Sequence, residues 1–430
     1  MWSKLRASLP LQLVIAALVA WGMASLLPNN NDIAQQGWYQ VITLGKTLYL
    51  GLLKMVVGIV VMLSLLQGIT SIGSIVRLKK IGRTTILFYS FTSMIAISLG
   101  LGVSLLLPAW QPLNSEVAVG EGVKLISEDA AGGGAIAEKL FSMALVNPIE
   151  ALAQGNLLAI VVFSFLLGIA LLSSLPAKHA LFDVLSGLNK GVNSIVSSII
   201  RLAPLAVFSI VFEFTVAGSG DLFQQLALFA LLVFTLTVIH GAIVLPSIAK
   251  LITGISIKRL FKALSAPMAM AFATSSSSAT LPLSMQTAEN ELGVSQSTSS
   301  MVLPLGAVMN MDGTALFEGV AAIFLAQLFG VDLTTSGLVM IFIMAMVSSV
   351  GAPGMPSGSM SGMQMVLLAA GIPLEAIAIL LIIERPLDTF RTAVNVEGDL
   401  IASLVVDKWA NDKSKLKDDL VICSPATVSV

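Results

Sequence analysis

Charge, cysteine and histidine are all scarce in this sequence, and each shortage excludes a class of protein. Charged residues make up 11% of the 430 positions, whereas hydrophobic residues make up 56%, and the mean hydropathy is +0.94. A soluble chain carries about a quarter charged residues, so this chain has too little polar surface to cover a globule in water. An ordinary soluble enzyme is therefore excluded, and the apolar excess is expected to contact a lipid bilayer.

The same shortages exclude nucleic acid as a partner and disulfides as cross-links. A net charge of −1 leaves no basic face for phosphates, which argues against binding to nucleic acid. Cys423 is the only cysteine, so an intrachain disulfide and a cysteine-rich metal site are excluded. His179 and His240 lie far apart in the sequence and form no ligand cluster, and we interpret each as a structural residue at a helix end.

Six apolar stretches before residue 250 approach the ~20 residues that a helix needs to cross a bilayer. They run from Pro10 to Leu27, Leu48 to Ile69, Ile86 to Leu107, Leu157 to Leu175, Ile195 to Ala217 and Leu222 to Ile248. The first stretch has no clear cleavage site, so we predict that it is retained as a span.

Lysine and arginine occupy alternate gaps between these stretches, and the other gaps are acidic or uncharged. Positively charged loops stay on the cytoplasmic side of a membrane. We therefore predict a multi-pass protein of the inner (plasma) membrane with both termini in the cytoplasm. The acidic segment from Pro108 to Glu150 is expected outside.

Two segments after residue 260 interrupt apolar sequence with serine, glycine and proline: FATSSSSATLPL at 272–283 and SSVGAPGMPSGSM at 348–360. Irregular backbone at membrane depth is tolerated only inside protein or beside a wet cavity, so we predict two re-entrant hairpins that meet inside the protein. Close helix packing is the alternative explanation of small residues, but four consecutive serines cannot all face one neighbour. A helix broken by polar residues is expected after each hairpin, at 310–314 and at 391–399.

A stripe of polar side chains marks the last predicted span, which begins near Ile379. At about 100° per residue these side chains share one face, whereas Glu397 points the other way, to an interface or to water. A charge at mid-bilayer costs at least about 2.5 to 3.5 kcal/mol, so the stripe requires protein partners, water or a ligand. An internal ion-pair network centred on Asp388 and Arg391 is the alternative to a functional site. The stripe comprises Glu384, Asp388, Arg391, Thr392, Asn395 and Asp399.

Two of the intramembrane carboxylates have no lysine or arginine at helical spacing, namely Asp312 and Asp399. Carboxylate, amide and hydroxyl oxygens with free backbone carbonyls suit an alkali or alkaline-earth ion, so we predict a bound monovalent cation. Arg391 matches a carboxylate, and Asp388 beside it can accept an ammonium group. These two side chains together fit a zwitterion that has an additional acidic group.

Five motifs resemble the dicarboxylate/amino acid:cation symporter family, the family of the glutamate and aspartate transporters. They are SSSSATLP at 275–282, GAVMNMDGT at 306–314, GAPGMP at 351–356, DTFRTAVNVEGD at 388–399 and, more weakly, YSFTS at 89–93. The resemblance implies an all-α integral membrane protein with eight transmembrane helices, two re-entrant helical hairpins and inverted repeats. It also implies a homotrimer that transports by an elevator mechanism.

The resemblance divides the chain into segments with separate roles. It implies scaffold helices 1 and 2 at 1–80, transport-domain helix 3 at 81–110, an extracellular segment with scaffold helices 4 and 5 at 111–220, transport-domain helix 6 at 221–257, hairpin 1 at 258–295, broken helix 7 at 296–330, hairpin 2 at 331–372, helix 8 at 373–410 and a cytoplasmic tail at 411–430.

The family's motifs also imply the binding residues. Cations would be held by Asp399 with carbonyls of Gly306, Asn310 and Asn395; by Thr92, Ser93, Asn310 and Asp312 near Tyr89; and by backbone at Ser349, Val350 and Ala352. Substrate would meet backbone at Ser275, Ser276, Ser277 and Met355, and side chains of Thr314, Asp388, Arg391, Thr392 and Asn395. In the family, the counterpart of Asp388 holds the amino group and that of Arg391 holds the distal carboxylate. Proton-coupled relatives tend to have Asn at the position of Asp399, which favours sodium here.

Two features depart from the family pattern. Many glutamate transporters have an arginine where this chain has Ser275 or Thr389, and in the family that arginine neutralises the counterpart of Asp388 as the site empties. The second hairpin tip is also richer in serine, with Ser357 and Ser359 at positions that are usually small and apolar.

We therefore predict a secondary active symporter, not an enzyme, that imports aspartate or glutamate with sodium ions. A proton- or sodium-coupled C4-dicarboxylate carrier, or a symporter of another amino acid, is the alternative within this class. An intramembrane aspartyl protease is disfavoured because VEGD at 396–399 lacks the first glycine of a GxGD motif, and because Arg391 would hold Asp388 as an anion. An ion channel is disfavoured because conduction requires weak binding rather than a substrate clamp.

Overall fold

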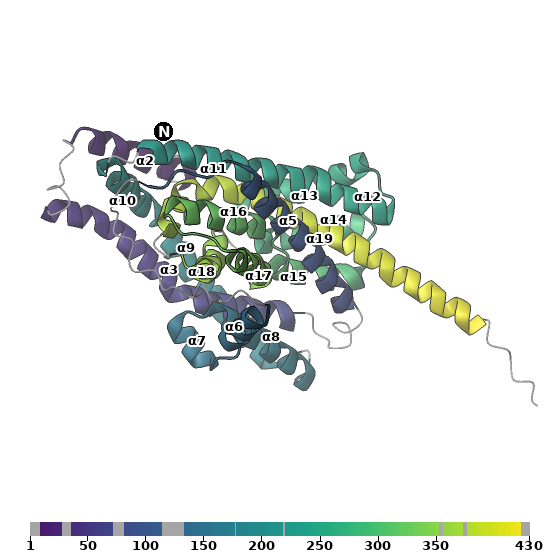
Figure 1. The fold of residues 1–430 in the computed structure, drawn as a ribbon. Helices are drawn as coiled ribbons and strands as arrows, with labels where there is room; N and C mark the ends of the chain where they lie inside the picture. The colour runs from purple at the N-terminus through teal and green to yellow at the C-terminus, as the bar shows by residue number, and fades with distance from the viewer. Residues whose placement is uncertain are drawn as a thin grey trace, which may run out of the picture.

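The computed structural model describes residues 9–27, 36–71, 81–113, 133–176, 178–217, 220–351, 354, 356–372 and 376–422. Every regular element within these residues is a helix (Figure 1), as the sequence predicts. The helices are α2 (Leu9–Ser25), α3 (Gly37–Thr70), α5 (Arg83–Leu106), α6 (Gly133–Ala144), α7 (Pro148–Gln154), α8 (Leu157–Ser174), α9 (Ala180–Ile200), α10 (Ala203–Val216), α11 (Gly220–Ile239), the π-helical turn η3 (His240–Val244), α12 (Leu245–Thr253), α13 (Ile257–Thr274), α14 (Ser277–Asn290), α15 (Gln296–Met309), α16 (Asp312–Leu328), α17 (Thr335–Gly351), α18 (Ser359–Ala370) and α19 (Ile377–Ile422).

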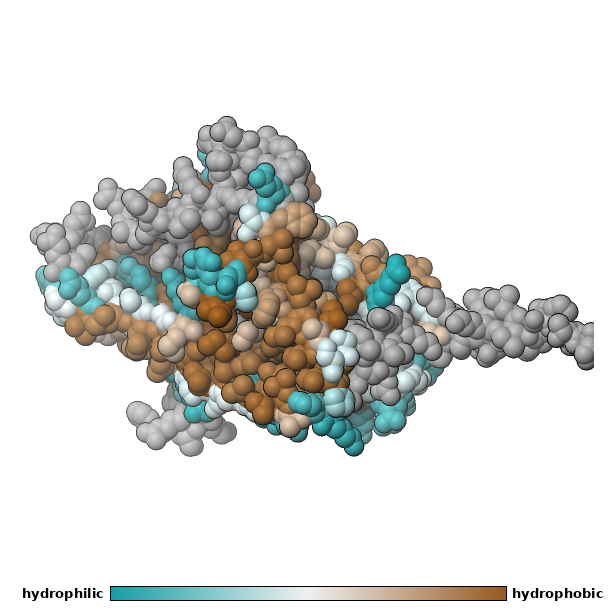
Figure 2. All heavy atoms as spheres, turned by 90° about the horizontal axis from the view of Figure 1, so that it is seen from below, coloured by the Kyte–Doolittle hydropathy of each residue, from teal (hydrophilic) through white to brown (hydrophobic). Residues whose placement is uncertain are grey.

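Six segments of the described chain are long and apolar enough to cross a membrane: Gly37–Thr70, Arg83–Leu106, Leu157–Ser174, Ala180–Val216, Asp221–Thr253 and Gln296–Leu328. Large apolar side chains also remain on the outside, among them Leu18, Met55 and Leu87, each at least 60% exposed. Figure 2 shows a broad apolar area over one face of the molecule. A contiguous apolar surface of this kind marks contact with lipid or protein, in agreement with the predicted multi-pass membrane protein.

One predicted span is divided in the structure. The stretch from Ile195 to Ala217 was expected to form one helix, but α9 ends at Ile200 and α10 begins at Ala203. Pro204 stands in the first turn of α10, where its missing N–H costs no helical hydrogen bond. A proline at this position favours a new helix start over continuation of the preceding helix.

Both predicted hairpins are present, and their tips meet. The first consists of α13 and α14, joined at Ser275, which adopts a left-handed φ of 50°. The second consists of α17 and α18, with Gly354 in the connection. The carbonyl of Gly354 accepts a hydrogen bond from Ser276 Oγ at 2.8 Å and another from the N–H of Ser278 at 3.0 Å. One backbone carbonyl of the second tip is thus satisfied by the first hairpin, as buried backbone at membrane depth requires.

The two helices that follow the hairpins differ from each other. The first is broken as predicted, because α15 ends at Met309 and α16 begins at Asp312. The second break, expected at 391–399, is wrong: α19 is continuous from Ile377 to Ile422. Polar side chains of α19 bond to neighbouring elements, for example Asn395 to Gly313 and Asp399 to Asn310, and the helix continues past them although Pro386 lies within it. The helix also continues into residues that were predicted to form the tail.

The helices pack as two groups. In one group α3 contacts α8, α9 and α10, and α10 also contacts α2. In the other, α19 is the central helix and contacts α11, α12, α13, α14, α15 and α16. Figure 1 shows α19 running through the molecule and protruding beyond it at its C-terminal end.

Two apolar clusters flank the polar stripe of α19. The cluster on the N-terminal side includes Leu380 of α19 with Phe317 and Phe324 of α16. The cluster on the C-terminal side includes Leu400 of α19 with Leu264 of α13. The polar stripe is therefore enclosed between two apolar regions, where water has little access.

Candidate functional site

A small polar cavity lies where the two hairpin tips meet the broken helix and α19. It contains about 240 Å³ of atom-free space, part of it open to solvent. Its walls combine hydroxyl, amide and carboxylate side chains with the backbone of the second tip. The lining residues are Ser275, Ser277, Met311, Thr314, Gly354, Gly358, Ser359, Asp388, Thr392 and Asn395.

Six of the nine predicted substrate residues line this cavity, namely Ser275, Ser277, Thr314, Asp388, Thr392 and Asn395. Ser276 does not line it, because its hydroxyl bonds to Gly354 and caps α14 at Ala279. Arg391 is not one of the lining residues and is fully buried. Met355 lies outside the described residues.

Arg391 is held by two carboxylates of its own helix. Its Nη2 lies 3.1 Å from Glu384 Oε1 and 3.2 Å from Asp388 Oδ1, and its guanidinium lies 4.0 Å above the ring of Phe317. The ion pair with Asp388 is therefore formed, as the network alternative expected, but Glu384 shares it. The Nε and Nη1 donors of Arg391 have no hydrogen-bond partner among the described residues. Buried donors of a charged group are rarely left unpaired, so this edge of Arg391 lacks the partner that a buried guanidinium usually has.

The second tip is bonded to the same pair of carboxylates. Asp388 Oδ2 accepts from the N–H of Ser357 at 3.0 Å and lies 3.4 Å from Arg385 Nη1. Ser357 Oγ donates to Glu384 Oε2 at 3.0 Å, and Ser359 Oγ lies 3.4 Å from the other oxygen of Glu384. The two serines that depart from the family pattern therefore attach the tip to α19.

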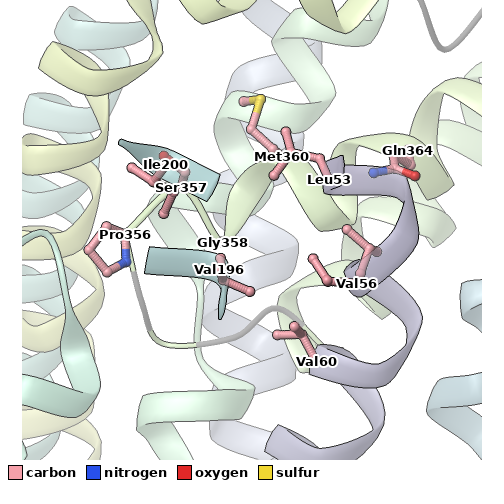
Figure 3. A pocket seen from close by; sticks show the side chains of 11 residues that line it. Leu53, Val56, Val60, Val196, Ile200, Pro356, Ser357, Gly358, Met360 and Gln364 are labelled. Atoms are coloured by element: carbon pink, nitrogen blue, oxygen red, sulfur yellow. The ribbon is translucent and has the colours of Figure 1, made fainter. Parts of the chain in front are cut away.

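A larger, apolar cavity lies on the other side of this tip (Figure 3). Val56 and Val60 of α3 and Val196 of α9 line it together with Pro356 and Ser357 of the tip. Among the described residues, no charged side chain lines this cavity. The turn around Gly358, which contributes to both cavities, thus separates an apolar space from the polar site.

One group of predicted cation ligands surrounds Asp399. Its carboxylate accepts from Asn310 Nδ2 at 2.9 Å, and Asn310 Oδ1 is buried without a hydrogen-bond partner among the described residues. Gly306 lies so close that a Cβ at that position would overlap Asp399 and the hydroxyl of Tyr89. That hydroxyl donates to the carbonyl of Val302 at 2.9 Å. Asn310 Oδ1 is thus an oxygen without a donor in this group, and amide and carboxylate oxygens are ligands that suit a hard cation.

A second group of predicted cation ligands surrounds Asp312. Ser93 Oγ donates to Asp312 Oδ1 at 2.6 Å and lies 2.9 Å from Ser349 Oγ, and the latter accepts from the N–H of Met311 at 3.1 Å. Thr92, which precedes Ser93 in the sequence, is also buried, but its hydroxyl donates to the carbonyl of Tyr89 within its own helix.

Asp312 also has a partner that the sequence analysis missed. His240 Nε2 lies 3.1 Å from Asp312 Oδ2, and both side chains are fully buried. The interpretation of His240 as a helix-end residue is wrong, because it stands at the start of the π-helical turn inside the α11–α12 segment. Its position inside an apolar span was the available signal, since ionisable residues at membrane depth are usually functional. His179 does cap a helix, accepting from the N–H of Leu181.

Asn395 joins the two groups to the cavity. Its Oδ1 accepts from the N–H of Gly313 at 2.8 Å, and its Nδ2 lies 3.3 Å from Thr314 Oγ1. Val350 lines a small cavity that also contains Tyr89 and Ser93. Ala352, the remaining predicted cation ligand, lies outside the described residues.

Two further buried carboxylates were not predicted as site residues. Glu318 of α16 is fully buried beside Ser348 and Gly362. Glu397 is also fully buried, so the expectation that it faces water is wrong, whereas its alternative placement at an interface agrees with its position against Gly241 of η3. The 100° spacing gave the direction of Glu397 but could not show that another helix covers it.

The model of the sodium:dicarboxylate symporter family matches residues 9–409. The chain belongs to this family. A member of the sodium:dicarboxylate symporter family is a transporter and not an enzyme, which confirms that prediction.

Three curated relatives illustrate the range of the family. The proton/glutamate-aspartate symporter of Escherichia coli (strain K12) is 31% identical, over 96% of this chain and 95% of the relative. The proton/sodium-glutamate symport protein of Geobacillus stearothermophilus is 30% identical, over 86% and 88%. The neutral amino acid transporter B(0) of Oryctolagus cuniculus is 33% identical, over 95% and 81%. These relatives differ in ion and in solute, so membership in the sodium:dicarboxylate symporter family leaves both open.

Proposed function

We propose that this protein is a secondary active symporter that imports aspartate or glutamate together with sodium ions. The observation that carries the proposal is the pairing of Asp388, which lines the polar cavity, with Arg391, whose Nε and Nη1 have no hydrogen-bond partner among the described residues. Asp388 can accept an ammonium group, and the free edge of Arg391 can bind a carboxylate. The names of two relatives, a glutamate-aspartate symporter and a glutamate symport protein, agree with such a solute.

Sodium is the proposed coupling ion. Asp399, the free Oδ1 of Asn310 and the backbone at Gly306 and Asn395 would form one site, and Asp312 with Ser93, Thr92, Asn310 and Tyr89 would form another. Backbone at Ser349, Val350 and Ala352 would supply a third. The orphaned amide oxygen of Asn310 fits this assignment, because a sodium ion would provide the partner that it lacks.

The proposal extends to the moving parts. Segments 1–80 and 111–220 would form the scaffold of a homotrimer, and segments 81–110 and 221–410 would move as the transport domain. Packing within the α3 group and within the α19 group is more extensive than packing between them, which supports this division. Native mass spectrometry should give three times the 44.9 kDa chain mass; a monomer in several detergents and in nanodiscs would contradict the trimer.

Transport is tested with purified protein in liposomes. Labelled aspartate or glutamate should accumulate when sodium is imposed outside, and not when choline replaces sodium. Uptake that follows a proton gradient in the absence of sodium would overturn the coupling ion. Uptake of neutral amino acids with no inhibition by aspartate would overturn the solute.

A further inference from the structure

Two arginines converge on Asp388, although the proposed function assigns only one of them to substrate. Asp388 Oδ1 lies 3.2 Å from Arg391 Nη2, and Asp388 Oδ2 lies 3.4 Å from Arg385 Nη1. The side chain of Asp388 is only 6% exposed and that of Arg385 only 14%. The contact with Arg385 is therefore largely shielded from water, and screening by solvent is weak.

Arg385 approaches Asp388 from outside the cavity. Asp388 is a lining residue, whereas Arg385 is not. A solute in the cavity therefore does not have to displace Arg385. The two groups that hold Asp388 Oδ2, Arg385 and the N–H of Ser357, can remain in place when the cavity is occupied.

The position of Arg385 matters most when Arg391 turns to the solute. A carboxylate on the free edge of Arg391 would compete with Asp388 for the charge of that guanidinium, and Asp388 would then need another positive partner. The ammonium of an amino acid supplies one. A dicarboxylate without an amino group supplies none, and a buried carboxylate that loses its only cation is strongly destabilising.

We propose that Arg385 is a specificity-determining residue that serves as a resident counter-cation for Asp388 and so lets the site accept C4-dicarboxylates without an amino group in addition to acidic amino acids. The proposal rests on the proposed function, because it takes Arg391 as the group that binds the solute's distal carboxylate. It requires no movement of the described residues other than a turn of Arg391.

The proposal is tested by competition in liposomes, with labelled aspartate as the transported solute and unlabelled succinate or aspartate as competitor. In the unaltered protein the inhibition constants of succinate and aspartate should lie within about tenfold of each other. Arg385→Gln should raise the constant for succinate at least tenfold relative to that for aspartate, because aspartate still brings its own ammonium. Arg385→Lys should restore part of the response to succinate. Arg259→Gln, at an exposed position of α13, is the matched control and should leave the ratio unchanged.

Equal shifts for the two competitors in Arg385→Gln, or no shift, would overturn the proposal, since a merely structural arginine does not distinguish them. Failure of succinate to inhibit the unaltered protein would overturn it as well, while leaving aspartate transport in place. If neither aspartate nor glutamate is transported, the proposed function fails by itself. In that case, thermal stabilisation by succinate is compared in the unaltered protein, Arg385→Gln and Arg385→Lys, and an equal shift in all three overturns the role of Arg385. If Arg385→Gln does not fold, the comparison is made between the unaltered protein and Arg385→Lys.

Discussion

Asp399 shows how a single buried side chain determines the expected ion dependence. Among the described residues its one hydrogen bond comes from Asn310. Asp399→Asn keeps the shape and removes the charge, so we expect the sodium concentration for half-maximal uptake to rise at least tenfold. Sodium activation curves in liposomes measure this shift. Asp221→Asn, at an exposed position in the first turn of α11, should leave the curve unchanged. If Asp399→Asn and Asp221→Asn give the same curve, Asp399 is not part of the ion site.

Arg391 is expected to determine whether acidic solutes are recognised. Arg391→Cys removes the planar donor that matches a carboxylate, so aspartate should cease to inhibit uptake while small neutral amino acids bind at least as well. Competition assays measure the change, and Arg259→Cys provides an exposed control. Unchanged inhibition by aspartate would show that Arg391 does not read the solute's side chain.

For single residues, the sequence predicted which side chains lie close together but not which of them pair. Helical spacing was sufficient to bring Asp388, Thr392 and Asn395 to one cavity. It could not show that Glu384 shares Arg391, because a side chain's choice between two carboxylates depends on its rotamer. The contact of His240 with Asp312 joins helices 72 positions apart, and local periodicity contains no information about such a contact.

At the scale of the elements, the packing of α15 against α19 requires a glycine at position 306. A Cβ at Gly306 would overlap the carboxylate of Asp399 and the hydroxyl of Tyr89. Gly306→Ala should therefore cost about 1–3 kcal/mol of stability by overpacking and should abolish thermal stabilisation by sodium. Gly102→Ala is the control, because nothing lies within 4 Å of its Cβ. Sodium stabilisation retained in Gly306→Ala would contradict the proximity of this glycine to the ion site.

The second hairpin tip is expected to shield the cavity when solute is bound. Ser359 lines the cavity, and Cys423 is the only native thiol, so Ser359→Cys in a Cys423→Ser background gives one reporter. Its reaction with a water-soluble maleimide should slow at least fivefold with sodium and aspartate. Ser297→Cys, at an exposed position of α15, should react at one rate with or without solute. Equal protection at both positions, or at neither, would contradict closure of the tip.

The sequence predicted most elements but not every boundary between them. The tips were predictable because runs of serine, glycine and proline cannot continue an apolar helix. The continuity of α19 was not predictable, because RTAVNVEGD in α19 resembles NMDGT between α15 and α16 in composition. Composition alone therefore does not distinguish a continuous helix from a broken one; the packing of neighbouring helices decides this.

At the scale of the whole molecule, the polar site lies between two apolar clusters that share α19. A ligand that binds only the folded protein raises its stability, by about 2.7 kcal/mol at a hundred times its dissociation constant. We expect sodium and aspartate together to raise the melting temperature more than the two separate shifts combined. Scans in detergent, with choline in place of sodium as the control, measure this; simple additivity would show that ion and solute bind independently.

The unbroken course of α19 has a mechanical consequence. At 46 residues and 1.5 Å per residue, the helix is about 69 Å long. The polar residues of its stripe from Asp388 to Asp399 lie on this one helix after Pro386, so helical geometry sets their mutual spacing. If the proposed transport takes place, we expect changes in affinity between the two sides of the membrane to arise in the two hairpin tips and in the break between α15 and α16, which face these residues across the cavity.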